Sequence, residues 1–311
     1  MLKRIIILSI VLISFSYQAK PPKVSGKRMP SKPYISGDGF RAMSDHVFDE
    51  TDKLLEASTV EYADIVFVKS DLLDVFFSTI HVKINNPYIL ISHNSDAAVP
   101  AGFIDFLGDE KVLHWFGQNP TIQDHSKFSA IPIGLANRYV HNAGNVSDFT
   151  TLFQLKSRNN QKTVLLGINF NPHTNLKARK DVFDYFDNKL FSSRLFASDH
   201  LEYLKKMLQA KFILSPPGNG FDCHRTWEAL IVGVVPVVLS SPMDELFKNM
   251  PVLIVDDWRV VDEDFLNESY EHIQKNMHAL STEKMTYDYW QQLLSDMQRQ
   301  MRSQSKKKRI V

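Results

Sequence analysis

The stretch KFILSPPGNGFDCHRTWEALIVGVVPVVL (Lys211–Leu239) carries the clearest fold signal in the chain. The apolar run at its start predicts a buried strand, and the run that follows Gly233 predicts another. Between them we expect a helix that Asp222 caps and Gly233 ends. Because ligands of open parallel sheets bind where strands run into helices, the stretch also indicates a binding site.

A cation stands in the first turn of this predicted helix. Arg225 lies where the helix macrodipole is positive, so the position favours a negative partner. One interpretation is a surface ion pair with Glu228, three residues further on. The other is an anion site, in which Gly218 and Gly220 adopt positive φ and free amides of the first turn join the arginine. The glycines and the apolar strand that follows favour the anion site.

The chain as a whole predicts an α/β fold. Strand and helix patterns alternate from residue 63 to residue 137 and again from residue 162 to residue 258, on either side of the polar segment 141–161. Such alternation is typical of βαβ units with parallel sheets. We expect two α/β domains, in residues 41–155 and 156–285. A C-terminal helix with a basic tail follows in residues 286–311.

The N-terminus has the layout of a secretory signal. Lys3 and Arg4 precede a short apolar run, which predicts a cleaved signal peptide or an uncleaved signal-anchor in residues 1–18. Residues 19–40 are rich in Pro, Ser and Lys, as in a stem or linker. In a eukaryote we expect the ER or Golgi lumen, with membrane anchoring through the N-terminus as an alternative. In a bacterium we expect an exported or envelope-associated protein.

Composition excludes several classes. The 311 residues have a formal net charge of +1, so no global field favours nucleic acid as a partner. Cys223 is the one cysteine, which rules out an intrachain disulfide and a four-cysteine zinc site. No motif with metal-ligand spacing occurs, and we expect neither a metal nor another cofactor. Adjacent helical residues diverge in direction, which argues against Cys223 and His224 as a nucleophile pair.

The stretch resembles the C-terminal signature of exostosin-like glycosyltransferases. That pattern, Ser-Pro-x-Gly-x-Gly-x-Asp-x-x-Arg-x-x-Glu-Ala-Leu followed by Gly-x-x-Pro-Val-Val and Pro-Val…Asp-Trp, has every fixed position filled here. The resemblance implies the glycosyltransferase B fold, which has two facing Rossmann-like domains and holds the nucleotide-sugar mainly in the second. It also implies metal-independent, inverting transfer from a nucleotide-sugar, by analogy a UDP-sugar, to a glycan or protein hydroxyl. The α1,3-fucosyltransferases share a looser version, so a GDP-sugar is an alternative donor.

The resemblance also implies residue roles. Arg225 would bind phosphate and Glu228 the ribose, while Arg179 in NLKARKDV is similar to a family basic residue on the donor side. Lys177 and Lys180 flank Arg179, so a solvated helix face is its other interpretation. The residues expected around the nucleotide-sugar are Arg179, Ser215, Gly218, Asn219, Gly220, Arg225 and Glu228.

Inverting transfer requires a base that deprotonates the acceptor, and we expect it in the first domain. The segment YILISHNSD ends a predicted strand with His93 and Asp96, the candidate catalytic residues. Asp96 has a structural alternative, which is to cap the following helix. Asp222 is a second candidate base. The candidates for sugar contacts are four polar residues: His114, Gln118, Asn119 and Asn137. We expect Trp115 and Phe116, which follow His114, in the core.

Two other classes of function compete with a transferase. A carbohydrate-binding or polysaccharide-assembly protein could keep the fold without catalysis, but it would have little use for Arg225 and Glu228. A hydrolase would need a nucleophile elbow or a clear pair of carboxylates, and the sequence offers neither.

Overall fold

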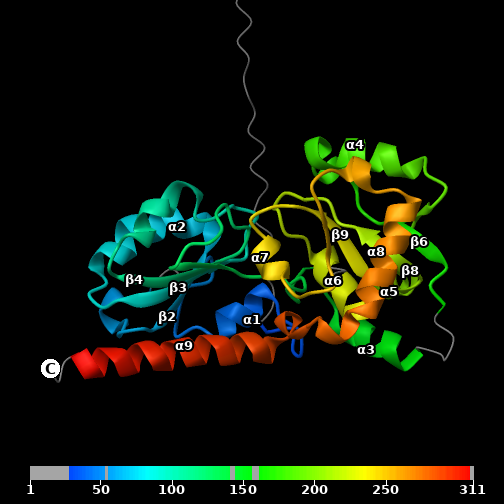
Figure 1. Cartoon of the computed structure of the whole chain (residues 1–311). Coiled ribbons are helices and arrows are strands. Elements are labelled where there is room, and N and C mark those ends of the chain that lie inside the picture. Colours follow the sequence, from blue (N-terminus) through cyan, green and yellow to red (C-terminus); the bar gives the residue numbers. More distant parts are fainter. Residues whose placement is uncertain (1–27, 53–54, 141–143, 156–160, 309–311) are drawn as a thin grey trace, which may run out of the picture.

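The computed structural model describes residues 28–52, 55–140, 144–155 and 161–308. Over these residues the chain is α/β, with two five-stranded parallel sheets that are compatible with two Rossmann-like domains (Figure 1). The predicted signal segment and the first part of the predicted stem lie outside the described residues. No helix of the described part is long and apolar enough to cross a bilayer.

The strands of the first sheet lie in the order in which the chain forms them. Each new strand is therefore added on the same side of the previous one. Since crossovers between parallel strands are right-handed, all of the connections lie on one face of the sheet. The short helix α2 (Leu73–Val75) and the turns around it cover this face. The strands are β1 (His46–Phe48), β2 (Ile65–Lys69), β3 (Tyr88–His93), β4 (Val112–Gly117) and β5 (Phe128–Ala130).

The other face of the first sheet is covered by the two ends of the described chain. Helices α1 (Gly37–Ala42) and α9 (Tyr287–Lys308) lie beneath the sheet, and α9 runs along its whole width (Figure 1). Polar contacts anchor α9 there, since Arg302 pairs with Asp64 at 2.6 Å and the Gln298 amide donates to the Ala63 carbonyl. The last helix therefore supplies a layer that the crossovers cannot provide.

The second sheet has the order β10-β9-β8-β6-β7, so the strand order reverses between β6 and β8. Such a reversal is the topological switch point at which open α/β sheets bind ligands. The strands are β6 (Val164–Ile168), β7 (Ser192–Arg194), β8 (Ala210–Leu214), β9 (Val235–Leu239) and β10 (Leu253–Val255). The helices are α3 (Val146–Leu155), α4 (Leu176–Asp187), α5 (His200–Leu208), α6 (His224–Val232), α7 (Asp244–Phe247) and α8 (Glu263–Lys275).

Two predicted boundaries differ from the structure. Residues 146–155, which we expected at the end of the first domain, form helix α3, and its Phe149 and Leu152 belong to one apolar cluster with Leu204 of α5 in the second. The apolar spacing within the polar segment 141–161 explains this packing. The second half of the predicted stem is not a free linker either, because Ile35 is buried and hydrogen-bonds to both Met285 and Leu135.

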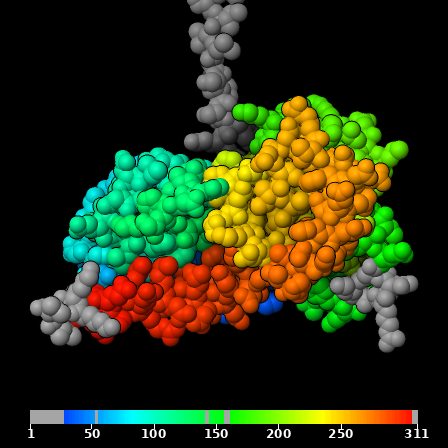
Figure 2. Space-filling model, viewed as in Figure 1, coloured from blue at the N-terminus to red at the C-terminus, as the bar shows by residue number. Residues whose placement is uncertain are grey.

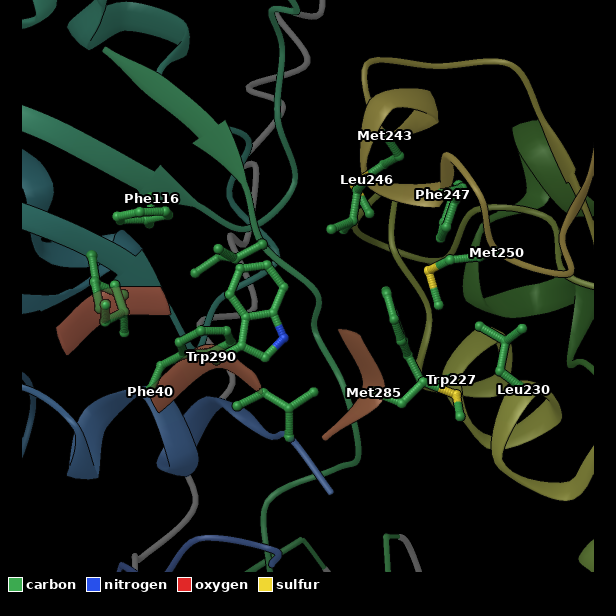
Figure 3. Close-up of a cluster of buried hydrophobic side chains, with 14 of the residues drawn as sticks. Phe40, Phe116, Trp227, Leu230, Met243, Leu246, Phe247, Met250, Met285 and Trp290 are labelled. Carbon is green, nitrogen blue, oxygen red and sulfur yellow. The ribbon is translucent and has the colours of Figure 1, made fainter. Parts of the chain in front are cut away.

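One apolar core joins the two domains. Trp290 of α9 packs edge-on against Phe40 of α1 at 5.4 Å, and Trp227 of α6 packs against Phe247 at 6.0 Å within the same cluster (Figure 3). The space-filling view shows the second domain in direct contact with the first, above α9 (Figure 2). The relative position of the two domains is therefore set by buried apolar surface.

Replacing Trp290 by Ala should destabilise both domains together. The indole is buried and its Nε1 donates to the Lys284 carbonyl at 2.7 Å, so the change removes apolar contacts and leaves a cavity. We expect a loss of about 3–5 kcal/mol in the free energy of unfolding, measured by urea denaturation. Gln291→Ala, at an exposed position on the same helix, is the control. A loss no larger than that of the control would contradict the shared core.

Candidate functional site

The carboxyl ends of β6 and β8 open into a cavity of about 530 Å³ between the two domains. Its position coincides with the switch point of the second sheet, and its size is typical of a small-molecule site. Loops of the first domain close one side. The predicted site residues that line it are Asp96, Arg179, Gly218, Asn219, Gly220, Arg225 and Glu228.

Arg179 is buried at the second turn of α4 rather than solvated, so the interpretation as an exposed helix face is wrong. Its Nε donates to the Pro217 carbonyl at 2.8 Å, and Nη1 donates to the Asn171 carbonyl at 3.3 Å. Burial lowers the pKa of Arg179, and the positive charge of Arg225 lowers it further. The structure thus places two cations close together at the loop that follows β8.

Arg225 is the less satisfied of the two cations. Its Nε donates to the Asn169 carbonyl at 2.5 Å, but its Nη1 is buried and has no hydrogen-bond partner within the described part of the chain. Both guanidinium groups lie near the ring of Phe170, at 5.5 Å for Arg225 and 5.6 Å for Arg179. Among the described carboxylates, none forms an ion pair with either arginine. The predicted Arg225–Glu228 surface pair is therefore absent.

The N-terminus of α6 differs from the prediction at its cap. Cys223, not Asp222, is the N-cap residue, and no side chain caps this helix. The Asp222 carboxylate instead accepts the amide of Ile133 from the first domain and the indole N–H of Trp227. Burial raises the pKa of Asp222 to about 7. The predicted end of the helix is confirmed, since Gly233 is left-handed at φ 76°.

The two loop glycines serve a different purpose from the predicted one. Neither Gly218 nor Gly220 adopts positive φ. A Cβ on Gly220 would lie 2.5 Å from the side chain of Asn119, and one on Gly218 would lie 3.0 Å from Arg179. Asn119 in turn accepts the amide of Asp222 at 2.9 Å. The glycines therefore allow side chains of the protein itself to approach the loop.

Ser215 is not part of the cavity wall. Its hydroxyl is buried and lies 2.8 Å from the hydroxyl of Thr226, which ties the end of β8 to α6. The expectation that Ser215 lines the nucleotide-sugar loop is wrong for its side chain. Asn219, by contrast, is exposed and lines the cavity.

Glu228 is part of a buried hydrogen-bonded network. Its Oε1 lies 3.3 Å from Nε2 of His200, its Oε2 accepts the hydroxyl of Tyr203 at 2.9 Å, and Nδ1 of His200 lies 2.8 Å from Asp148. Burial disfavours the charged imidazole, but the two carboxylates outweigh it and raise the pKa of His200. Burial also disfavours the charged form of Glu228, yet contact with His200 holds the pKa of that carboxyl below its ordinary value. His200, Tyr203 and Asp148 were not predicted, because their link to Glu228 joins three helices.

A second cavity, of about 390 Å³, lies on the first-domain side. Asp96, Ile133 and His224 line both cavities, so the two adjoin. Asp96 is exposed and does not cap the helical turn that begins at Ala101, whose N-cap is Pro100. Its alternative structural role is therefore excluded. The uncharged polar residues that line this second cavity are Asn94, Ser95, Gln118, Asn137 and Tyr139.

His93 is held by backbone groups on both ring nitrogens. Its Nε2 donates to the Pro132 carbonyl at 2.9 Å, and its Nδ1 accepts the amide of Asn94 at 2.6 Å. Burial lowers the pKa of His93 to about 4. The ring thus has no free nitrogen with which to deprotonate a substrate, so we correct the predicted catalytic role of His93 to a structural one.

His224, which the sequence suggested only as half of a nucleophile pair with Cys223, has one ring nitrogen bound and one free among the described residues. Its Nδ1 lies 2.7 Å from the Gly134 carbonyl, which can only accept, so Nδ1 carries the proton. In the neutral ring Nε2 is then an acceptor, and no hydrogen bond joins it to any residue that the structure describes. Because His224 lines both cavities, this nitrogen is placed for proton transfer or for a ligand contact.

The three predicted positions that remain are buried and lie outside both cavities. Trp115 and Phe116 are fully buried, as predicted. His114 lies outside both cavities and bonds the Ser129 hydroxyl at 3.0 Å. Over the described ranges, His, Cys, Asp and Glu form no group of three that could hold a metal ion.

Comparison of the chain with protein-family models gives no match, and comparison with curated proteins gives no significant one.

Replacing His200 by Gln should destabilise the protein in a pH-dependent way. Because the folded-state pKa lies above the ordinary value of 6.5, protonation stabilises the fold below pH 6.5, and this contribution is lost as pH rises through the folded-state pKa. We expect the variant to lose roughly 1–3 kcal/mol in acid and less in alkali, measured by urea unfolding across pH. His278→Gln, at an exposed position, is the control. A pH-independent difference would contradict the charged network.

Proposed function

We propose that the protein is a glycosyltransferase that moves a sugar from a nucleoside diphosphate donor to a hydroxyl of a glycan or protein. The observation that carries the proposal is the buried, unpartnered Nη1 of Arg225 beside a second unpaired arginine. The resemblance to exostosin-like glycosyltransferases supports it, and two facing domains of the glycosyltransferase B type belong to the proposal. We infer a UDP-sugar as donor and keep a GDP-sugar as the alternative.

The charge of the site fits a diphosphate. Two guanidinium groups without carboxylate partners repel each other, and an anion between them removes that repulsion. The uncapped first turn of α6, which starts at His224, adds amide donors and the positive end of a helix dipole. These groups would also stabilise the diphosphate as it leaves, which is what transfer to an acceptor requires.

Glu228 is placed to bind ribose. Each carboxylate oxygen has two acceptor sites, and the contacts with His200 and Tyr203 use one on each oxygen. The remaining sites can accept ribose hydroxyls, since Glu228 lines the cavity. Contact with His200 outweighs burial and lowers the pKa of Glu228, which favours the ionised carboxylate, the form that accepts without donating.

The adjoining cavity fits an acceptor sugar. Its amide and hydroxyl side chains match the hydrogen bonding of saccharide hydroxyls, and the two cavities meet at Asp96, Ile133 and His224. An acceptor hydroxyl at this junction would face the donor sugar. We propose Asp96 as the base that takes its proton, with Nε2 of His224 as the second group in reach. The proposal includes no metal, because the arginines and helix amides supply the positive charge.

The rival without catalysis is a carbohydrate-binding protein with the same fold. It shares the acceptor cavity but gives no reason for unpaired arginines at the switch point. The secretory or envelope location, with anchoring through the N-terminus, remains part of the proposal because those residues lie outside the described ones.

Replacing Arg225 by Ala should weaken nucleotide binding. Loss of a charge-assisted hydrogen bond reduces affinity for UDP by about tenfold or more, measured by calorimetry with UDP and GDP. Lys180→Ala is the matched control, since Lys180 is an exposed cation on α4 that pairs with Asp184. If the wild-type protein binds neither nucleotide, the proposed function is wrong.

Replacing Asp96 by Asn should separate binding from turnover. The amide cannot accept the proton, so donor hydrolysis should fall by about a hundredfold while UDP affinity stays the same. The assay measures free nucleotide released from a panel of UDP- and GDP-sugars. Asp105→Asn, at an exposed position of the same domain, is the control. Unchanged turnover would exclude Asp96 as the base, and a loss in His224→Gln alone would assign that role to His224.

A further inference from the structure

Phe196 is a large apolar side chain on the wall of a cavity whose lining residues are mostly of polar types. It lies two residues beyond β7 and lines the 530 Å³ cavity, with 47% of its surface exposed. It belongs to none of the buried apolar clusters of the described chain. A single exposed apolar residue usually needs no explanation, but this one faces the same cavity as Arg225 and Glu228.

The ring of Phe196 is held in a stack. It lies parallel to the ring of Phe183 from α4, with centroids 6.5 Å apart and planes 15° apart. The guanidinium group of Arg194 lies 5.2 Å from the ring of Phe183, and Arg194 pairs with Asp187. Phe183 therefore lies beside the Phe196 ring in a nearly parallel plane, and the half-exposed ring of Phe196 keeps surface that is available to a planar ligand.

The backbone around Phe196 is fixed as well. The amide of Leu195 donates to the Ile168 carbonyl at 2.9 Å, and the carbonyl of Phe196 accepts Nζ of Lys206 at 2.7 Å. Further along, Ser198 donates both its amide and its hydroxyl to the Glu202 carboxylate. A ring ordered before binding loses little conformational entropy when a ligand stacks on it.

The order of groups along the cavity follows that of a nucleotide. The arginines lie at the switch point between β6 and β8. Glu228 hydrogen-bonds to His200 and Tyr203 of α5, a helix that begins four residues after Phe196. Because neighbouring strands are about 4.8 Å apart, the end of β7 lies about 7 Å from the switch point across the sheet. Phosphate, ribose and base would thus meet the arginines, Glu228 and Phe196 in turn.

We propose that Phe196 stacks on the nucleobase of the donor. The inference rests on the proposed function, since it names the residue that extends the phosphate site to a whole nucleotide. Base–aromatic stacking tolerates any base, because every base has a π face. The ring thus contributes affinity for nucleoside diphosphates over free phosphates, and it accepts uracil and guanine alike.

Calorimetry with UDP, GDP and inorganic pyrophosphate tests this role. In Phe196→Ala we expect affinity for both nucleotides to fall by about tenfold, because base stacking is lost. Affinity for pyrophosphate should not change, because it reaches only the arginine end. In Phe196→Trp, which keeps an aromatic ring, we expect the affinity for both nucleotides to stay near that of the wild-type protein. Phe153→Ala is the matched control, since Phe153 of α3 is also a partly exposed phenylalanine, at 39%, but lies outside the 530 Å³ cavity.

The outcomes separate this inference from the proposed function. If the wild-type protein binds UDP and Phe196→Ala binds it equally well, the inference is wrong and the proposed function stands. An equal loss for UDP and pyrophosphate, with an unchanged melting temperature, would also overturn the stacking role. If the wild-type protein binds pyrophosphate but neither nucleotide, the proposed function fails, and the base platform fails with it.

Discussion

The buried carboxylate of Asp222 is the contact on which the geometry of the site depends. Asp222 belongs to the second domain, yet its carboxylate accepts the backbone amide of Ile133 from the first domain at 2.7 Å. The backbone amide of Asp222 in turn donates to the side chain of Asn119. The same carboxylate accepts the indole N–H of Trp227, whose ring is part of the core shared by both domains. One side chain therefore connects the glycine loop, the first domain and the apolar interface. A shift of the domains would break these bonds and leave a buried carboxylate without partners.

The cation pair next to this contact is costly for the fold alone. Arg179 and Arg225 are held by backbone carbonyls, which solvate a guanidinium group but do not neutralise it. Like charges held close together destabilise the folded state, and proteins tolerate such conflicts mainly at functional sites. Glu228 differs from the arginines in that it has a partner of opposite charge, because Nε2 of His200 lies 3.3 Å from its carboxylate. The site therefore combines an unsatisfied positive end with a satisfied negative one, and this difference is what the proposed nucleotide ligand would use.

Local patterns predicted the elements well and the partners of side chains poorly. The buried strands and the helix ended by Gly233 were predicted because apolar runs and left-handed glycines are local signals. The three-residue strands β1 (His46–Phe48) and β7 (Ser192–Arg194) were missed, since neither has an apolar run long enough to recognise. The roles of Ser215 and His93 were wrong for one reason, which is that a position after a strand does not reveal whether a neighbouring segment already binds the side chain.

The sequence by itself determined the α/β class, the glycine loop between β8 and α6, and the presence of Arg225 and Glu228 on one face of that helix. Tertiary structure alone decided that Arg179 turns inward to the same loop, that His200 balances Glu228, and that Asp96 and His224 stand where two cavities meet. The physical reason is that helix and strand periodicity act over a few residues, whereas charge balance and burial depend on segments tens of residues apart in the chain.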